Sequence, residues 1–205
     1  MPSGENTIST EEKIKQAART VFMRKGYAAT RTRDIAEECG LNLALINYYF
    51  RSKENLFNIV MLELCQLFAS NVKELLNNPD TTLHEKIENL VHHYIDMLLN
   101  NPSIPFFILN EAHTNPELFL SRIGLNDTMQ EIYIVKQINE QIAKTGLNIN
   151  PTHIILNTIS MTVFPFAAAP MVMAKSKITS EEYKKMMEDR KTMIPKWIAT
   201  MLEHK

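Results

Sequence analysis

The residues best suited to chemistry lie between positions 40 and 57, where the chain reads GLNLALINYYFRSKENLF. Amide, phenol and cationic side chains stand next to one another there. If a helix runs through this stretch, Ile46 and Phe50 are one turn apart and share the inward face. The opposite side then carries small, polar and aromatic residues, namely Ala44, Leu45, Asn47 and Tyr48. This outward set fits a groove of DNA.

The side chains of the outward set match known ways of reading base pairs. An asparagine amide can pair with both N6 and N7 of adenine, which is the role we expect for Asn47. Ala44, Leu45 and the ring of Tyr48 can meet the methyl groups of thymine. The stretch therefore combines one hydrogen-bonding reader with an apolar surface.

Phosphate contacts are expected at both ends of this surface. Tyr49 and Lys53 suit phosphates, and Arg33 suits either a phosphate or a guanine edge. The alternative is that Tyr49 and Phe50 are ordinary core aromatics and that Arg51 and Lys53 form a solvated corner. We favour DNA binding because the turn, the caps and the outward face all agree.

Two short helices position these side chains. Thr30 is expected to cap the first helix, which runs to Cys39, and Gly40 is expected to end it. Asn42 can cap the second helix, which runs to about residue 50. Two such helices joined by a tight turn form a helix-turn-helix, whose second helix enters the major groove of DNA.

Residues 26–57 resemble the DNA-binding head of the tetracycline-repressor-like (TetR) regulators, and the resemblance covers about residues 10–60. The matching features are Gly26-Tyr27, Thr30, Arg33-Asp34-Ile35-Ala36, Gly40, Tyr49-Phe50 and Ser52-Lys53-Glu54. The resemblance implies a homodimer that binds a palindromic operator and represses transcription. It also implies a ligand-binding body whose occupancy releases the DNA.

The resemblance assigns roles to residues by position. It implies that Thr30, Thr32 and Arg33 contact the DNA backbone or bases, that Leu43, Ala44, Leu45, Asn47 and Tyr48 line the groove, and that Tyr49 and Lys53 bind phosphates. Asn42 belongs to the same expected surface. Leu43 often matches a polar or basic residue in the family and Asn47 often matches a tyrosine, so the operator sequence does not transfer.

The composition predicts an all-α fold. Of 205 residues, 45% are hydrophobic and only 5 are glycine, and no stretch alternates as a strand does. We expect a flexible tail at 1–9, a helix-turn-helix DNA-binding domain at 10–57, and a helical ligand-binding and dimerisation domain at 58–205. Helices are expected over about 10–26, 30–39, 42–50, 52–76, 82–100, 103–114, 116–121, 126–145, 151–174 and 180–203.

The charge is nearly balanced overall but is uneven along the chain. The net charge of −1 argues against a strong binder of polyanions, yet residues 1–57 hold nine Lys and Arg against seven Asp and Glu. This excess of positive charge suits a nucleic-acid-binding head joined to a neutral body. Cys39 and Cys65 are typical of reduced cysteines, and the N-terminus has no apolar or basic leader. We therefore expect a cytoplasmic protein.

The last two predicted helices are the expected dimer surface. Residues 151–174 are apolar nearly all round and long enough to span a membrane, but they include Pro165 and several polar residues. We expect this helix to be buried on several sides. Residues 180–203 carry methionines and Trp197 against a charged face. Together with the resemblance, this pattern predicts a homodimer through residues 151–203, with kinks at Pro165 and Pro195.

An effector pocket is expected among the middle helices of the body. Apolar walls with a few polar points suit a small apolar or aromatic molecule. The candidate ligand-binding residues are Tyr94, Met97, Leu98, Phe107, Asn110, His113, Asn157, Met161 and Phe164. Each of them could equally be packed core.

Metal-binding and enzymatic readings are weaker. His84, Glu88 and His92 recur every four residues on one predicted helix, a spacing that can hold zinc. A solvated helix face is the simpler interpretation, so we expect no metal and no cofactor.

The chain lacks a glycine-rich phosphate loop, a Gly-x-Ser-x-Gly elbow and a His-Glu-x-x-His motif, so we expect no enzyme. The alternatives are a DNA-binding activator or architectural protein without small-molecule control, and a helical metal-binding protein.

Overall fold

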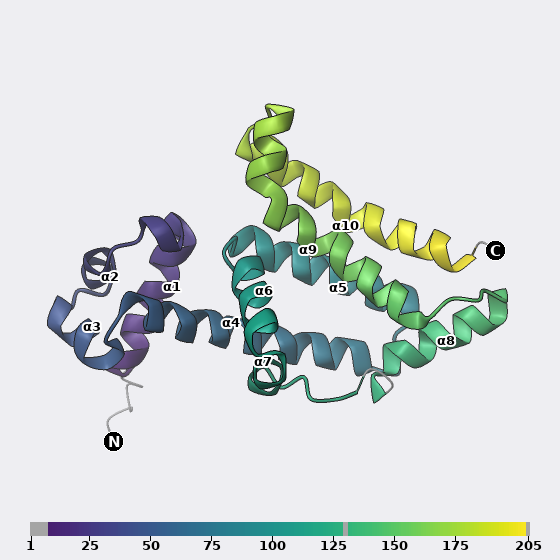
Figure 1. Ribbon diagram of the computed structural model, residues 1–205, viewed down its shortest axis with the longest axis horizontal. Helices are drawn as coiled ribbons and strands as arrows, with labels where there is room; N and C mark the ends of the chain where they lie inside the picture. Colours follow the sequence, from purple (N-terminus) through teal and green to yellow (C-terminus); the bar gives the residue numbers. More distant parts are fainter. Residues whose placement is uncertain (1–7, 129–130, 204–205) are drawn as a thin grey trace, which may run out of the picture. The chain divides into compact units, whose positions relative to one another are not determined.

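The computed structural model describes residues 8–128 and 131–203, and within those ranges the chain forms ten α-helices and no strand. The prediction of an all-α fold is confirmed. The chain divides into two compact units between Cys65 and Gln66; we call residues 8–65 the head and residues 66–203 the body. The helices, labelled in Figure 1, are α1 (Thr10–Ala29), α2 (Thr32–Cys39), α3 (Leu43–Phe50), α4 (Lys53–Asn77), α5 (Leu83–Asn100), α6 (Ile104–Thr114), α7 (Pro116–Arg122), α8 (Tyr133–Thr145), α9 (Pro151–Ser176) and α10 (Ser180–Glu203).

Three helices and the first part of α4 build the head around one apolar core. α1 packs against α2, and α2 packs against α3. The buried side chains recur every three or four residues, so each helix turns one face inward. They are Ile14, Ala17, Ala18, Val21 and Phe22 of α1, Ile35, Ala36 and Cys39 of α2, Ile46 and Phe50 of α3, and Leu56, Val60, Met61, Leu64 and Cys65 of α4.

Local capping explains the turn between α2 and α3. The side chain of Asn42 accepts a hydrogen bond from the backbone N–H of Leu45 at 2.9 Å, which confirms the predicted cap of α3. Gly40 ends α2 with a φ of 65°, a left-handed conformation that glycine adopts without a steric cost. The sequence of the turn therefore fixes where both helices stop and start.

Other side chains set the starts of α1 and α2, and the predicted Thr30 cap of α2 is wrong. Ser9, rather than Thr10, caps α1, because its hydroxyl accepts a backbone N–H bond of the first turn at 3.2 Å. α2 begins at Thr32 because the hydroxyl of Thr30 is occupied elsewhere and donates to the C=O of Gly26 at 2.7 Å. Gly26 has a φ of 72° and breaks α1 near its end. Thr30 therefore completes the end of α1 instead of opening α2.

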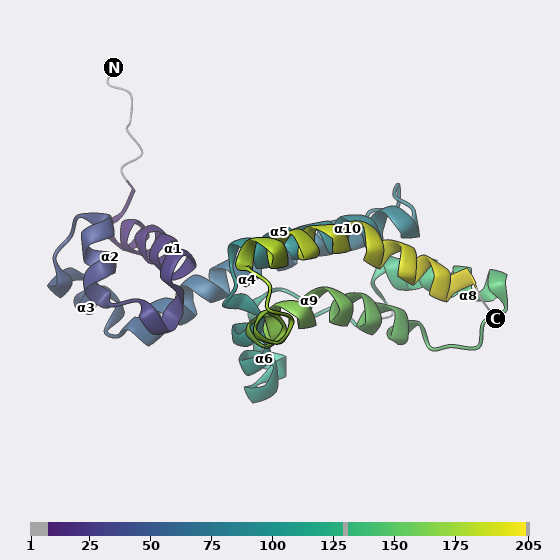
Figure 2. The ribbon, with the colours of Figure 1, turned by 90° about the horizontal axis from the view of Figure 1, so that it is seen from above.

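The body is built around α5, which packs against α8, α9 and α10. α5 and α10 run side by side in Figure 2. α9 also packs against α6, α8 and α10, and α6 packs against α7. α8 begins at Tyr133, so the predicted start near residue 126 is wrong. Before α8, the backbone N–H of Thr128 donates to the carboxylate of Glu131 at 2.7 Å; residues 129–130 lie outside the described residues.

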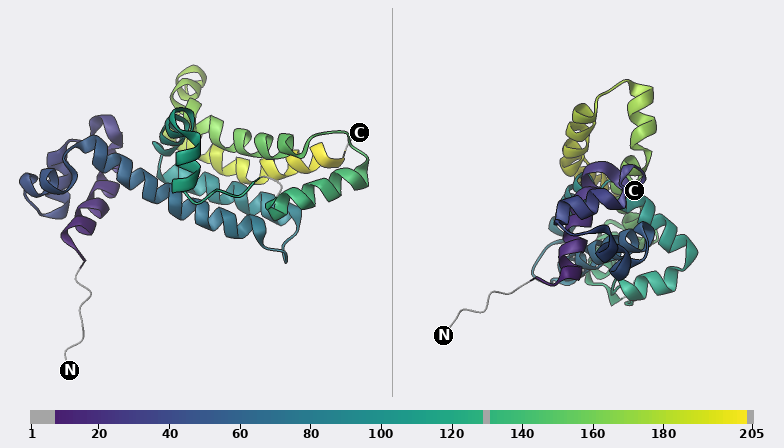
Figure 3. Two further views of the ribbon diagram at one scale, coloured as in Figure 1. Left: turned by 60° about the horizontal axis from the view of Figure 1, so that its bottom comes forward. Right: turned by 90° about the vertical axis from the view of Figure 1, so that its left-hand side faces the viewer.

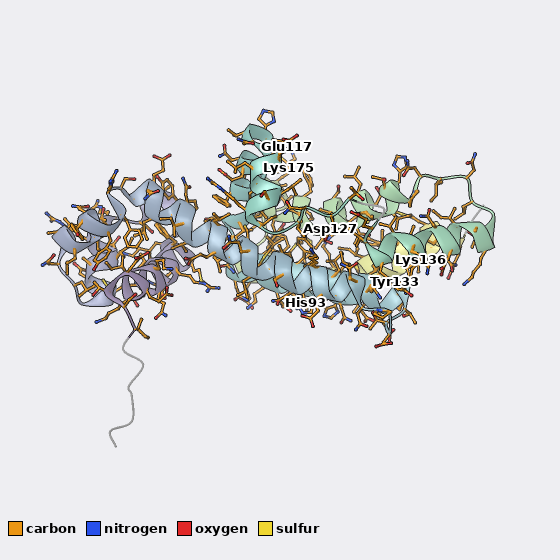
Figure 4. All side chains as sticks on the ribbon, turned by 90° about the horizontal axis from the view of Figure 1, so that it is seen from below. His93, Glu117, Asp127, Tyr133, Lys136 and Lys175 are labelled. Carbon is orange, nitrogen blue, oxygen red and sulfur yellow. The ribbon has the colours of Figure 1, made fainter. Side chains whose placement is uncertain are left out.

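Lys86 of α5 is buried, and its ammonium contacts both the loop between α4 and α5 and a ring of α8. The side chain of Lys86 has no exposed surface, and its ammonium donates to the C=O of Asn78 and to the C=O and hydroxyl of Thr81. It also lies 5.2 Å from the ring centroid of Tyr133, whose ring is 5.6 Å from the ammonium of Lys136 one turn further along α8 (Figure 4). Burial lowers the pKa of Lys86, because the charged form loses water.

α9 bends, and two residues of α10 compensate for the bend. Figures 1 and 3 show the last part of α9 turning away from the direction of its first part. Pro165 has no N–H, so the C=O of Met161 lacks its helical donor. The guanidinium of Arg190 donates to that C=O at 2.7 Å, and the hydroxyl of Tyr183 donates to the C=O of Pro165 at 2.6 Å. The side chains of Arg190 and Tyr183 thus stabilise the helix at the predicted kink.

α9 leaves much of its apolar surface open in the single chain. Its buried residues form one stripe at four-residue intervals, namely Ile154, Thr158, Thr162 and Phe166. Among the described residues, α9 is long and apolar enough to cross a membrane, and 28% of that apolar stretch is buried. Burial of α9 wholly within one chain is therefore not observed, and its predicted burial on several sides stays a prediction that requires a second copy of the chain. One face packs on the body, and much of the remaining apolar surface is open.

Candidate nucleic-acid interface and ligand cavity

The outward face of α3 is open over the residues predicted to read DNA. Ala44, Asn47 and Tyr48 are exposed, and Tyr48 reaches 79% exposure. Ile46 and Phe50 are each 1% exposed, so the predicted inward face is confirmed. The core of the head thus packs against one side of α3. The other side exposes the amide of Asn47 together with the methyl group of Ala44 and the ring of Tyr48.

The two tyrosines at the end of α3 support each other. The rings of Tyr48 and Tyr49 meet edge to face, with centroids 5.3 Å apart. Tyr49 is 41% exposed and also lies 6.3 Å from the ring of Phe50, which belongs to the core. Edge-to-face pairs of this kind are favourable, so each of the two rings stabilises the position of the other.

The other predicted DNA-binding residues differ in accessibility. Arg33 and Asn42 are exposed, and the amide oxygen of Asn42 is already used in capping α3. Thr32, Leu43 and Leu45 are half-buried. These residues come from the start of α2 and the first turn of α3, the two regions that a helix-turn-helix presents to DNA.

The side chain of Thr30 is buried, unlike those of the other predicted DNA-binding residues. Its side chain is 2% exposed, and its hydroxyl is bonded to the C=O of Gly26. The Thr30 side chain therefore does not lie on the outer surface with the other candidates. Its role in the head is to fix the junction between α1 and α2.

Charged side chains next to the helix-turn-helix are partly neutralised within the head. The carboxylate of Asp34 accepts the backbone N–H of Arg31 at 2.8 Å and pairs with the ammonium of Lys25 at 2.9 Å. These contacts, the backbone bond first, hold the pKa of Asp34 below its ordinary value. Arg24 pairs with Glu38 at 2.9 Å. The cations in these pairs are less available to a phosphate than unpaired ones.

Lys53 has a structural partner that the sequence did not suggest. Its ammonium donates to the C=O of Tyr27 at 2.9 Å and to the C=O of Thr30 at 3.0 Å. It also lies 4.2 Å from the centroid of the Tyr27 ring. Two of its three N–H donors are thus committed to the α1–α2 junction. The predicted phosphate contact can use only the remaining donor.

Replacing Lys53 with methionine is expected to destabilise the protein. The two carbonyls would lose a charged donor in a partly buried setting, so the free energy of unfolding should fall by about 1–3 kcal/mol. Denaturant unfolding of the full chain measures this change. Lys25→Met is the control, because Lys25 makes an exposed ion pair and should matter by less than about 1 kcal/mol. Equal stability of the Lys53 variant and the wild type would refute the anchoring role.

The body contains an apolar cavity of about 70 Å³ between α4, α5, α8 and α9. Among the residues that the structure describes, no charged side chain lines it. The lining residues are Val72, Leu76, Ile87, Leu90, Tyr94, Ile132, Ile134, Ile138, Ile154, Ile155, Thr158 and Ile159. The hydroxyl of Thr158 donates to the C=O of Ile154 at 2.8 Å, so it is already used. The cavity suits an uncharged apolar molecule.

A second cavity of about 250 Å³ lies between α5, α8 and α10. Its walls combine buried aliphatic residues with polar side chains at the opening. The lining residues are Leu83, His84, Ile87, Gln141, Pro195, Ala199, Leu202 and Glu203. This cavity is larger but less enclosed by apolar surface than the first.

The structure brings few of the predicted ligand-binding residues into either cavity. Of the nine, Tyr94 lines the apolar cavity. Leu98 and Phe107 are buried core residues, as the alternative interpretation allowed. The others lie elsewhere: Met97 and Met161 are half-buried, Asn157 donates to the sulfur of Met201 at 3.6 Å, and Asn110, His113 and Phe164 are exposed. The sequence missed the isoleucines of α8 and α9, which resemble any other core residues.

The histidines of α5 do not gather into a metal site. Across residues 8–128 and 131–203, no group of three or more His, Cys, Asp or Glu side chains could hold a metal ion. His84 lines the second cavity, and the ring Nε2 of His92 is buried without a hydrogen-bond partner. The zinc alternative for His84, Glu88 and His92 therefore gains no support from the geometry.

Comparison with known proteins agrees with this architecture. Residues 14–60 match the family model described as "Bacterial regulatory proteins, tetR family". The probable HTH-type transcriptional regulator YttP of Bacillus subtilis (strain 168) is 27% identical over 162 residues, which is 78% of each chain. YfiR, an uncharacterized HTH-type transcriptional regulator of the same organism, is 28% identical over 95 residues, or 46% of this chain and 43% of that protein.

Solved structures share the fold over most of the chain. A TetR/AcrR family transcriptional regulator of Thermobifida fusca YX-ER1 superposes with a TM-score of 0.61 at 19% identity, over 90% of this chain and 96% of that chain. The TetR family regulator PfmR of Thermus thermophilus gives 0.58 at 18% identity, over 91% and 95%. The family match lies on the helix-turn-helix and the shared fold extends through the body, so residues 14–60 are a DNA-binding domain of the TetR family and the chain has the fold of TetR-family transcriptional regulators.

Proposed function

We propose that this protein is a repressor that binds a palindromic DNA operator as a homodimer and leaves it when a small apolar molecule enters the body. The observation that carries the DNA-binding part is the exposed face of α3. Asn47 lies there between Ala44 and Tyr48, with the core residues of α3 on the other side. This face offers adenine an amide and offers thymine methyl groups an apolar surface.

The homodimer is supported by apolar surface that α9 and α10 leave open. Large contiguous apolar patches on soluble proteins mark interaction sites. The exposed large side chains on these helices are Leu156, Ile159, Phe164 and Met171 of α9, and Met186, Met193 and Trp197 of α10. A two-fold axis through this surface would bring identical patches together and would match the symmetry of a palindrome.

The effector is proposed to bind in the 70 Å³ cavity between α4, α5, α8 and α9. At this size the cavity holds only a few heavy atoms, so a larger ligand must push its walls apart. Ligand binding would then favour a body conformation that differs from the one bound to DNA. Bound ligand must then weaken DNA binding by the same factor by which bound DNA weakens ligand binding.

α4 is the proposed carrier of this coupling. It is one continuous helix from Lys53 to Asn77, and residues from its second half line the cavity. The side-chain amide of Gln66 donates to the C=O of Arg122 at 2.9 Å, which ties α4 to α7. A movement of the cavity wall can therefore reach the first part of the same helix, which belongs to the head. Acting on chromosomal DNA, such a regulator would work in the cytoplasm.

Selection of bound duplexes from a random DNA pool tests the DNA-binding proposal. A two-fold symmetric consensus is expected. If each subunit touches three or four phosphates, the logarithm of the binding constant should fall against the logarithm of salt concentration with a slope of roughly −5 to −7. No enrichment at low salt would refute the proposed function. Release of the selected duplex by neutral aliphatic and aromatic compounds then tests the effector.

Leu76→Phe is expected to block the effector without disturbing DNA binding. Leu76 lines the apolar cavity and is half-buried, so a larger ring there can occupy the space that a ligand needs. The concentration of a releasing compound should rise roughly tenfold or more, whereas operator affinity should stay unchanged. Leu75→Phe on the same helix, outside the cavity lining, is the matched control. Equal responses of the two variants would place the effector elsewhere.

A further inference from the structure

Arg51 follows α3 directly and has a backbone conformation that arginine rarely adopts. Its φ is 64° and its ψ is −44°. The backbone N–H of Ser52 donates to the C=O of Phe50 at 2.7 Å, which closes a γ-turn around Arg51. γ-turns with positive φ are rare and strained in residues that carry a Cβ. Strain of this kind tends to persist at functional sites, where the side chain itself is needed.

The position of Arg51 continues the exposed face of α3. Its backbone N–H still donates to the C=O of Asn47 at 3.0 Å, which is the helical i to i−4 bond. Arg51 is four residues after Asn47 and three after Tyr48, and these two residues are three and four residues after Ala44, which are the intervals of one helix face. Arg51 is exposed. It therefore stands one turn beyond the residues that face DNA in the proposed complex.

The charge of Arg51 is available to a partner. In the part of the chain that the structure describes, its guanidinium makes no ion pair and no hydrogen bond, whereas Arg24 and Lys25 are paired with Glu38 and Asp34. α3 itself, LALINYYF, contains no charged residue. An unpaired cation thus adjoins a recognition helix that has no cation of its own.

We propose that Arg51 binds an operator phosphate beside the groove that α3 enters. This contact rests on the proposed function as a dimeric DNA-binding protein. The N-terminal residues of a recognition helix meet base edges, so a residue past its C-terminus is better placed for the flanking backbone. A planar guanidinium can bind two phosphate oxygens at once. A glycine would relax the turn but would remove this contact.

Four variants of the full-length protein separate a phosphate contact from a structural role. Arg51→Gln removes the charge, Arg51→Lys keeps it, and Arg51→Gly removes it while relaxing the backbone. Arg24→Gln is the matched control, because it changes the net charge of the head by the same amount at a side chain that is already paired. Each variant is titrated with salt on the duplex selected by the wild type, and its thermal unfolding midpoint is measured.

Arg51→Gln and Arg51→Gly are expected to reduce the steepness of the salt dependence by about 1.8 per dimer, which means roughly 60-fold weaker binding at 0.1 M salt. Arg51→Lys and Arg24→Gln should stay close to the wild type. The unfolding midpoint of Arg51→Gly should be unchanged or higher, because glycine accepts a positive φ.

Three results would overturn the phosphate contact: equal salt dependence of Arg51→Gln and wild type, equal losses in Arg51→Gln and Arg24→Gln, or a lower unfolding midpoint for Arg51→Gly. A change in base preference with an unchanged slope would also overturn it, because that result identifies a base contact. If the wild type itself selects no DNA, the proposed function fails together with this contact. If the wild type selects a symmetric site and Arg51→Gln binds it equally well, the contact alone fails.

Discussion

Phe164→Glu is expected to turn the protein into a monomer that binds its operator on the order of a hundredfold more weakly or worse. The Phe164 side chain is 65% exposed on α9, so a glutamate there costs the isolated subunit little. In the proposed dimer the same carboxylate would be taken out of water without a partner, which is strongly unfavourable. A monomer binds each half-site separately and loses the gain that comes from linking two heads.

Light scattering during gel filtration gives the mass, and titration of the selected duplex gives the affinity. Phe106→Glu is the matched control, because Phe106 is 56% exposed but lies on α6, outside the proposed interface. It should leave both the mass and the affinity unchanged. A dimeric Phe164→Glu protein with full affinity would show that the apolar surface of α9 serves another purpose.

Asn47→Ala is expected to weaken operator binding by about 1–3 kcal/mol for each half-site, and so by about 2–6 kcal/mol for a symmetric operator. The amide of Asn47 is the hydrogen-bonding group flanked by Ala44 and Tyr48 on the exposed face of α3. Its loss should also remove the preference for adenine at one position of each half-site. The salt slope should not change, because no phosphate contact is lost.

Repeating the DNA selection with the variant measures this change directly. Asn58→Ala, which removes an exposed amide from α4, is the control and should reproduce the wild-type consensus. An unchanged consensus and affinity for Asn47→Ala would mean that Asn47 does not read a base. In that case the half-buried residues at the start of α3 would have to supply the specificity.

The head could be predicted from sequence because its information is local. The spacing of Ile46 and Phe50 gives the inward face of α3, and Asn42 and Gly40 give its boundaries, all within one or two turns of chain. Lys53 shows where this reasoning stops. Its carbonyl partner on Tyr27 is 26 residues away, so the sequence around Lys53 suggests only a free cation.

The body was harder to predict because periodicity shows which residues are apolar but not what covers them. α9 is apolar nearly all round, and the sequence predicted burial on several sides and a dimer surface without showing which face packs on the body. The structure leaves Phe164 and Met171 open on it. The isoleucines that line the apolar cavity gave no distinguishing signal, because an aliphatic side chain looks the same whether it fills a core or borders a void. Arg51 gave none either, since its strained turn appears only in the backbone angles.

The contact between Arg190 and the C=O of Met161 has an evolutionary consequence. Arg190 supplies a donor that Pro165 cannot, so the two positions depend on each other although they lie on different helices. With any other residue at 165, the backbone could make the bond itself, and position 190 would be free to drift. While proline is present, losing the arginine leaves a carbonyl unpaired. The order in which a lineage acquires these two changes therefore decides whether the path between them passes through a weakened protein.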